Sequence, residues 1–319
     1  MIVYIKTFNR PFYLDRCLAS LKAFGSGVSR VVVLDDGTLP AYLERITTLY
    51  PQVEIRQSGG QHGKWELVRA KRFEDITSRF TTPQTFWSRE IAADAASMIC
   101  VLEDDTWLTR RVDFTALKAG MREGGLSICR LFWGDAPDGP AQRSVAVRPL
   151  WPRESLVIQT ARPTHLSDVW GVFLVCMCVY ERTFYEAAHA GVSDFRLENL
   201  MLQNVWRELA QSVEPLFFGR LSKRACCQGW AIPGRSDAKY YAMGVEQHVF
   251  VDLLNELWLR GGFAPLHNFP ADFDIDWLCG LFAGHMPVNS VEAYRAWRAN
   301  DPGARAFPGL VPPARLESL

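Results

Sequence analysis

Apolar runs alternate with amphipathic stretches through the first hundred residues of the chain. Strands are predicted at 2–5, 30–34, 53–57 and 97–102, where the sequence reads "IVYI", "RVVVL", "VEIRQ" and "SMICVL". Between them, helical spacing of apolar residues predicts helices at 12–24, at 40–49 and in segments from about 65 to 95. Because continuous apolar runs are typical of strands buried on both faces, this alternation predicts an α/β fold with a doubly wound, mostly parallel sheet.

The second half of the chain is less regular. Strands are predicted at 126–134, 144–150, 154–160 and 169–180, and helices at 181–190 and 195–211. No polar linker separates the two halves, so we expect one compact unit with a second lobe. The cleft between the lobes is then the default place for a ligand.

Composition narrows the classes of protein that the chain can belong to. Its 319 residues are 48% hydrophobic, which is enough for a sizeable core. Lys plus Arg equals Asp plus Glu at 35 each, so no overall field would gather nucleic acid or an anionic membrane. The longest apolar run, 169–180, is shorter than the ~20 residues of a membrane-spanning helix. The start of the chain lacks a secretory signal pattern, and eight cysteines without metal-ligand spacing favour the reducing cytoplasm.

Three adjacent acids, Glu103, Asp104 and Asp105, follow the predicted strand at 97–102. Three negative charges behind a buried strand need something to neutralise them. Mg²⁺ and Mn²⁺ prefer oxygen ligands, and Mg²⁺ commonly uses one or two carboxylates together with water and phosphate oxygens. The alternative is an acidic cap on a following helix, in which Thr106 or the carboxylates accept from free N–H groups.

Two further polar clusters, "TFNRP" and "DDGT", lie where ligands bind in doubly wound sheets, beyond the carboxyl ends of strands. In the second of them, Asp35, Asp36 and Gly37 either hold a ribose or a base or form an ordinary turn. Elsewhere, the predicted Gly-rich loop "SGGQHGK" ends in Lys64, which either faces a diphosphate or belongs to a solvated basic helix face.

The ordered set of these motifs resembles a known family. The segments "MIVYIKTFNRPFYLDRCLASL", "RVVVLDDGT" and "ICVLEDDTW" are similar to those of nucleotide-sugar-dependent glycosyltransferases of the GT-A fold, chiefly family 2 and relatives with Glu-Asp-Asp. The resemblance covers about residues 1–130 and implies that they are the nucleotide-sugar-binding half. Residues 131–319 would then be the acceptor-binding half and the C-terminal region.

The resemblance also implies a role for each matched residue. The nucleoside pocket would be lined by Thr7, Phe8, Asn9 and Arg10. Asp36, with Asp35 as its neighbour, would meet the base or the ribose. At the acidic triplet, Asp105 would be the direct ligand of a divalent metal, Mn²⁺ or Mg²⁺, and Glu103 and Asp104 would touch ribose or metal-bound water.

The acceptor-activating base is expected in the predicted helix at 195–211. Inverting members of the family place a carboxylate in about this region, often as a Glu-Asp pair, whereas this chain has Glu198 followed by Asn199. Glu198 lies off the apolar stripe of the helix. Asp194 lies just upstream, at the expected helix start, and the sequence leaves both carboxylates open as the base or as surface and capping residues.

The resemblance therefore implies an enzyme that moves a sugar from a nucleotide diphosphate sugar to a hydroxyl acceptor, in bacterial surface-glycan assembly. The acceptor would be a glycan or another hydroxyl compound, a lipid-linked one included, which would bring the protein to the inner face of the membrane. One alternative is a catalytically idle protein that binds nucleotide sugar or glycan. Another is a sugar-1-phosphate nucleotidyltransferase, against which "TFNRP" counts because a triphosphate needs a Gly-rich basic loop there.

Overall fold

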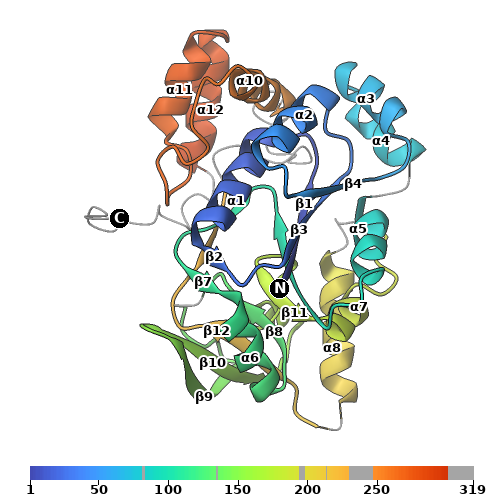
Figure 1. Cartoon of the computed structure of the whole chain (residues 1–319), viewed down its shortest axis with the longest axis vertical. Coiled ribbons are helices and arrows are strands. Elements are labelled where there is room, and N and C mark those ends of the chain that lie inside the picture. Colours follow the sequence, from blue (N-terminus) through green and yellow to red (C-terminus); the bar gives the residue numbers. More distant parts are fainter. Residues whose placement is uncertain (81–82, 134–135, 194–197, 213, 230–246, 301–319) are drawn as a thin grey trace.

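The computed structural model of the chain describes all residues except 81–82, 134–135, 194–197, 213, 230–246 and 301–319 (Figure 1). Asp194, one of the two candidate bases, lies outside the described residues. No described helix is long and apolar enough to cross a membrane.

A nine-stranded sheet runs through both halves of the chain. Its strands lie in the order β4-β3-β1-β5-β11-β8-β12-β10-β9. In chain order they are β1 (Ile2–Thr7), β3 (Arg30–Asp35), β4 (Glu54–Gln57), β5 (Met98–Glu103), β8 (Leu126–Arg130), β9 (Gln142–Trp151), β10 (Glu154–Ala161), β11 (Cys178–Glu181) and β12 (Phe217–Leu221). Only β10 and β11 run against the other strands of this sheet. The predicted α/β fold with a mostly parallel sheet is therefore confirmed.

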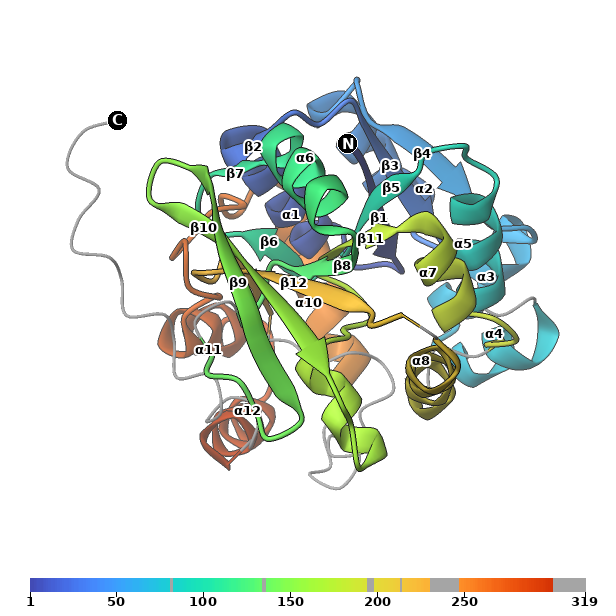
Figure 2. The same cartoon turned by 90° about the horizontal axis from the view of Figure 1, so that it is seen from below.

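Helices cover both faces of the sheet. They are α1 (Pro11–Phe24), α2 (Pro40–Leu49), α3 (Gln61–Arg69), α4 (Phe73–Arg79), α5 (Pro83–Ala92), α6 (Phe114–Gly124), α7 (Arg182–Ala188), α8 (Glu198–Gln211), α10 (Gln247–Leu259), α11 (Ile275–Ala283) and α12 (Val288–Asn300). Figures 1 and 2 show α1 and α6 on one side of the central strands and α5 and α7 together on the other. A short ladder between β2 (Gly25–Ser26) and β7 (Val112–Asp113) links the ends of α1 and α6.

The register of the parallel strands brings the three polar clusters to one edge of the sheet. Thr7 at the end of β1 pairs with Asp35 at the end of β3, and Lys6 pairs with Glu103 at the end of β5. Carboxyl ends of neighbouring parallel strands meet at the same edge, which is where open α/β sheets bind ligands. The sequence predicted this placement, and the structure confirms it.

The apolar run at 169–180 was predicted as one long strand, and that prediction is wrong. Leu166–Gly171 is a 3₁₀ helix, and only Cys178–Glu181 forms a strand. Most of the residues between them are still buried, Val172 and Phe173 completely. An apolar run predicts that its residues are buried, but it does not predict their backbone conformation. Here the residues between the 3₁₀ helix and the strand form an irregular segment in the core. Met177, with φ of 57°, ends this irregular stretch before β11.

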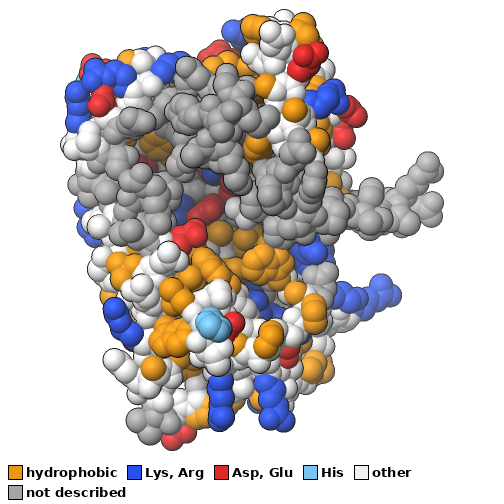
Figure 3. Space-filling view, turned by 180° about the vertical axis from the view of Figure 1, so that it is seen from behind, with side chains coloured by type: hydrophobic (Ala, Val, Ile, Leu, Met, Phe, Trp, Pro, Cys, Tyr) orange, Lys and Arg blue, Asp and Glu red, His pale blue; other side chains and the backbone are white. Residues whose placement is uncertain are grey.

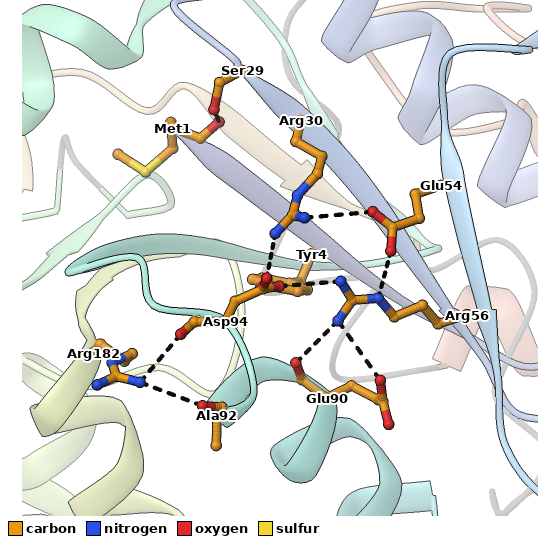
Figure 4. A network of polar contacts seen from close by, with 10 residues as sticks. All are labelled: Met1, Tyr4, Ser29, Arg30, Glu54, Arg56, Glu90, Ala92, Asp94 and Arg182. Carbon is orange, nitrogen blue, oxygen red and sulfur yellow. Dashed lines mark hydrogen bonds and ion pairs between the residues drawn. The ribbon is translucent and has the colours of Figure 1, made fainter.

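A network of charged side chains lies near the amino ends of the strands, away from the clustered carboxyl ends (Figure 4). Asp94, just before β5, accepts from the Tyr4 hydroxyl and lies 2.5 Å from a guanidinium nitrogen of Arg30 and 3.3 Å from one of Arg56. Glu54 also pairs with Arg56, at 2.6 Å. These mutual pairs tie β1, β3 and β4 to the end of α5, so this network has a structural explanation.

Candidate active site

Arg10 pairs with two of the three carboxylates of the acidic triplet. Its guanidinium hydrogen-bonds Asp104 and lies 3.0 Å from Oδ2 of Asp105. Burial alone would lower the pKa of Arg10, but the two carboxylates raise it above its usual value. Burial raises the pKa of Asp104 to about 6 against the opposing charge of Arg10, so Asp104 is still ionised at pH 7. Arg10 thus faces the acidic triplet, at the start of α1.

Asp104 also fixes the end of β1. Its Oδ2 accepts a hydrogen bond from the Thr7 hydroxyl at 2.9 Å and a longer one from the Phe8 N–H at 3.4 Å. The turn continues through Asn9, which has φ of 51° and whose N–H donates to Oγ1 of Thr38 at 2.8 Å. The structure therefore brings the predicted nucleoside-binding segment and the acidic triplet into direct contact. The roles of these residues toward a nucleoside stay predictions.

No helix follows the acidic triplet, so the alternative of an acidic helix cap is wrong. The next element is β6 (Thr106–Leu108), which pairs with β13 (Cys226–Gln228). Trp107 of β6 is fully buried and stacks on Tyr13 of α1 with ring centroids 6.3 Å apart. The triplet therefore forms a tight turn between two strands, and packing of Trp107 against α1 holds that turn next to Arg10.

One carboxylate oxygen of Asp105 has no partner among the described residues. Its Oδ2 is paired with Arg10, whereas its Oδ1 is buried and has no hydrogen-bond partner among the described residues. Within the described part of the chain, no three His, Cys, Asp or Glu side chains converge as a metal-binding group. A buried carboxylate oxygen of this kind fits a cation that takes one or two protein carboxylates and fills its other positions with water and phosphate oxygens.

Glu103 points to the other face of the sheet from Asp104. It is in register with Lys6 of β1, and cross-strand partners share a face. Burial raises the pKa of Glu103 to about 7, and the positive charge of Lys6 opposes that rise. Asp104 and Asp105 therefore face Arg10, whereas Glu103 faces Lys6.

Asp35 closes the turn after β3 with its own side chain. Oδ1 accepts from the Thr38 N–H at 2.9 Å, and burial raises the pKa of this carboxyl to about 6. Gly37 has φ of 145°, and a Cβ there would lie 2.9 Å from the Phe8 ring, so the turn requires glycine. The turn that the sequence offered as an alternative is present here, and a ligand-binding role for Asp35 stays a prediction.

Asp36 forms a buried ion pair with Lys64. Nζ of Lys64 lies 2.7 Å from Oδ1 of Asp36 and 2.6 Å from Oγ of Ser58. Lys64 belongs to α3, which begins at Gln61, so its predicted place in a Gly-rich loop is wrong. Both side chains are almost fully buried, which also excludes a solvated basic helix face. Contacts of either residue with a ligand stay a prediction.

We expect Lys64→Met to lower the free energy of unfolding by about 3–5 kcal/mol, because it leaves Asp36 as a buried charge without its cation. Urea denaturation followed by circular dichroism measures the change. Adding Asp36→Leu to Lys64→Met should recover most of the loss, since the uncompensated charge is then gone. Lys22→Met, at an exposed position of α1, is the control. A loss below about 1 kcal/mol in the single variant would contradict the assigned ion pair.

Glu198 is the first residue of α8, and its side chain is exposed. Partial burial raises its pKa, and the charge of Lys6 opposes the rise. Lys6 therefore lies within electrostatic reach of both Glu198 and Glu103. Asn204, further along α8, donates to the carbonyl oxygens of Ala188 and Ala190 at 3.0 and 2.9 Å and ties α8 to the end of α7.

The molecule is hollowed on the face shown in Figure 3, and acidic side chains gather in this hollow beside basic ones. Hydrophobic side chains cover much of the surface below it. A concave site with a few convergent charged groups and an apolar surround is the usual form of a small-molecule site.

Comparison with known proteins adds little to this picture. No protein-family model matches the chain, and no curated protein matches it in sequence. Among solved structures, S. aureus TarS aligns over 99% of this chain with a TM-score of 0.43 and 12% identity. The match covers 46% of the TarS chain, so this protein spans about half the length of TarS. TarS 1-349 in complex with UDP and with UDP-GlcNAc aligns over 96% and 94% of this chain and 73% and 74% of that one, each with a TM-score of 0.44 and 12% identity. TM-scores below 0.5 establish neither fold nor function, so both rest on the geometry given above.

Two buried polar residues near the triplet were not singled out from the sequence, Lys6 and His189. Lys6 could have been noticed in the sequence, because a lysine is unexpected within the apolar strand "IVYIKT", which is predicted to be covered on both faces. His189 lies at the end of α7 with 4% of its surface exposed. A single histidine after a helix gives no such signal.

Proposed function

We propose that the protein is a glycosyltransferase of the GT-A type, which moves a sugar from a nucleotide diphosphate sugar to a hydroxyl acceptor. The observation that carries the proposal is the contact between the acidic triplet and the segment after β1. Asp104 accepts from Thr7 and Arg10, at the carboxyl edge of a mostly parallel sheet. The motifs that resemble family 2 glycosyltransferases in sequence thus meet at one place in the fold.

The chemistry that the site supports is displacement of a nucleoside diphosphate from an anomeric carbon. The acceptor oxygen forms a bond to that carbon, the bond to the diphosphate oxygen breaks with its electron pair leaving on the diphosphate, and a base takes the acceptor proton. Glu198 supports the role of base because its exposed carboxylate lies at the start of α8, within reach of the charge of Lys6 that also acts on Glu103. Arg10 supplies positive charge at the triplet, where the leaving diphosphate gains negative charge.

A divalent cation, Mn²⁺ or Mg²⁺, is part of this proposal. Asp105 would hold it, since Oδ1 is buried and has no partner among the described residues. When bound, the cation would offset charge on the departing diphosphate. Arg10 already lies on Oδ2 of Asp105 and on Asp104, so the protein's own side chains keep the triplet compact.

A second candidate is a catalytically idle nucleotide-sugar binder. The observation that favours it is the pairing of Arg10 with the acidic triplet. The Arg10 guanidinium already neutralises Asp104 and pairs with one oxygen of Asp105. The two candidates differ in turnover rather than in binding. Release of nucleoside diphosphate from a nucleotide sugar, by transfer or by hydrolysis, would establish the enzyme.

A thermal-shift screen of UDP, GDP, ADP, CDP and dTDP and their common sugar esters, each with and without Mn²⁺, tests the proposed function. A ligand at 100 times its Kd stabilises the folded state by about 2.7 kcal/mol, which raises the melting temperature by several degrees. We expect one nucleobase to give the largest shift and Mn²⁺ to increase it. The corresponding nucleosides, which lack the diphosphate, are the control. If no nucleoside diphosphate shifts the melting temperature with or without Mn²⁺, the proposed function is wrong.

A further inference from the structure

Lys6 is a lysine on a buried strand, and its ammonium has no charged partner among the described residues. It lies on β1 with 2% of its surface exposed. Among the described residues its ammonium makes no ion pair and no hydrogen bond, and Nζ lies 5.3 Å from the centroid of the Trp87 ring. Burying a charge without a partner is costly, and buried charges in proteins are normally paired. The ammonium of Lys6 can therefore donate to a polar group that approaches this face of the sheet.

Glu103 offers its carboxylate to the same space. It is opposite Lys6 in the register of β1 and β5, so the two side chains leave the sheet on one face. The pair does not make a direct ion pair, and the Glu103 carboxylate has no hydrogen-bond partner in the described part of the chain. Lys6 thus offers a hydrogen-bond donor and Glu103 an acceptor at neighbouring positions on the same face of the sheet.

His189 presents a third open group. Its Nδ1 lies 2.8 Å from the carbonyl oxygen of Tyr185, and a carbonyl only accepts, so Nδ1 carries the proton and Nε2 is an acceptor. Nε2 is buried and has no partner among the described residues. The ring stacks on Tyr185 at a centroid distance of 3.9 Å, which fixes its orientation. Burial and the charge of Lys6 lower the pKa of His189 to about 3, so it is neutral.

These groups lie on the α5/α7 face of the sheet. Lys6 is in register with Glu103 and contacts Trp87 of α5, and α5 packs against α7, at whose end His189 lies. The charge of Lys6 acts on Glu103, His189 and Glu198 alike. Lys6 can only donate, and Nε2 of His189 can only accept. With one ammonium and two carboxylates, the set does not favour an anion. A hydroxyl group fits it, because it accepts from Lys6 and donates to His189 or Glu103 at the same time.

We propose that Lys6, Glu103 and His189 form a subsite that binds hydroxyl groups of a sugar, next to Glu198 at its exposed rim. The inference rests on the proposed function and deepens it, because it names residues that hold the sugar itself. Both the donor sugar and an acceptor sugar carry such hydroxyls, and the shared chemistry is a polyhydroxylated neutral ring. Lys6 is the residue on which the subsite depends, since its ammonium donates to the hydroxyl oxygen.

The test compares Lys6→Met with the parent protein. Methionine keeps an unbranched side chain of similar length against Trp87 but removes the ammonium. Isothermal titration calorimetry gives Kd for the nucleoside diphosphate that stabilises the parent most, and for its sugar esters. We expect Kd for the sugar ester to rise about 10-fold or more in Lys6→Met, while Kd for the nucleoside diphosphate changes less than about twofold. A residue that only supported the fold would change both alike.

A second arm separates the donor from the acceptor. Methyl glycosides of common hexoses, added with and without the nucleoside diphosphate, report binding of a sugar that is not part of the donor. Loss of glycoside binding alone in Lys6→Met assigns the subsite to the acceptor, and loss of sugar-ester affinity alone assigns it to the donor; both results support the proposal. Lys22→Met, at an exposed position of α1, should match the parent in both arms.

His189→Phe keeps an aromatic ring for stacking on Tyr185, removes Nε2, and replaces Lys6→Met as the test if that variant does not fold. The proposal is overturned if the folded variants bind sugar esters and methyl glycosides as the parent does, which would leave the space between Lys6 and His189 to water. Failure of the proposed function looks different, because the parent itself would then bind no nucleoside diphosphate. The glycoside arm would still test the subsite in that case.

Discussion

Asp105→Ala is expected to remove the extra stabilisation that Mn²⁺ gives to a nucleoside diphosphate complex and to lower the rate of sugar transfer about 10²- to 10³-fold. The reason is the buried Oδ1 of Asp105, which has no partner among the described residues and lies at the turn after β5. Loss of this ligand leaves the diphosphate without its main neutralising charge. Thermal shift with and without Mn²⁺ measures the first effect, and release of nucleoside diphosphate from the nucleotide sugar measures the second.

The fold should survive this substitution, because Arg10 keeps its bonds to Asp104 and the turn keeps the bond between Asp104 and Thr7. The matched control is Glu123→Ala, which removes an exposed carboxylate on α6. If Asp105→Ala still shows a parental Mn²⁺-dependent shift, the cation is held elsewhere or plays no part in binding. A parental rate would further indicate that Arg10 alone neutralises the diphosphate.

The sheet of the first half could be predicted because its signal is local. The segments "VVVL" and "MICVL", which directly precede Asp35 and Glu103, are apolar at every position, and such runs arise when both faces of a strand are covered. Register then follows from the fold class, since parallel strands end at a common edge. The run at 169–180 has the same composition, but it fills the core partly as a 3₁₀ helix and partly as irregular chain. Composition alone does not separate these outcomes.

The partners of the site residues could not be predicted, because they depend on contacts between distant parts of the chain. Arg10 meets Asp104 across 94 positions, and Lys64 meets Asp36 across 28. The sequence placed Arg10, Asp36 and Asp104 at the correct edge of the sheet but did not indicate which cation neutralises which carboxylate. A buried ion pair is favoured when its geometry satisfies both charges, and that geometry exists only once the helices have packed.

Lys6 shows what a closer reading of the strand pattern can add. A charged residue in an otherwise apolar buried strand contradicts the local pattern, and such contradictions are expected at functional sites. The segment "IVYIKT" contains that contradiction, whereas nothing in the sequence around His189 does. The two residues come together only because α7 packs on the face of the sheet that carries Lys6, so their juxtaposition required the structure.

Glu198→Gln is expected to lower the rate of transfer about 10²- to 10⁴-fold, the effect of losing a general base, while the affinity for the donor stays near the parental value. Glu198 begins α8, its carboxylate is exposed, and Lys6 links it electrostatically to Glu103. Glutamine keeps the size of the side chain but cannot take a proton from the acceptor hydroxyl. Steady-state rates with an acceptor, or of donor hydrolysis with water as acceptor, measure the loss.

The pH profile separates base chemistry from packing. Because burial raises the pKa of Glu198, kcat/KM of the parent should fall as the pH drops through that raised value, and this acidic limb should disappear in Glu198→Gln. Glu208→Gln makes the same change ten residues further along α8, about 15 Å away, and should leave rate and profile unchanged. Asp194→Asn tests the other carboxylate that the sequence offered. If Glu198→Gln and Asp194→Asn both turn over at the parental rate with the acidic limb intact, the proton is taken by another group, and α8 serves only to shape the site.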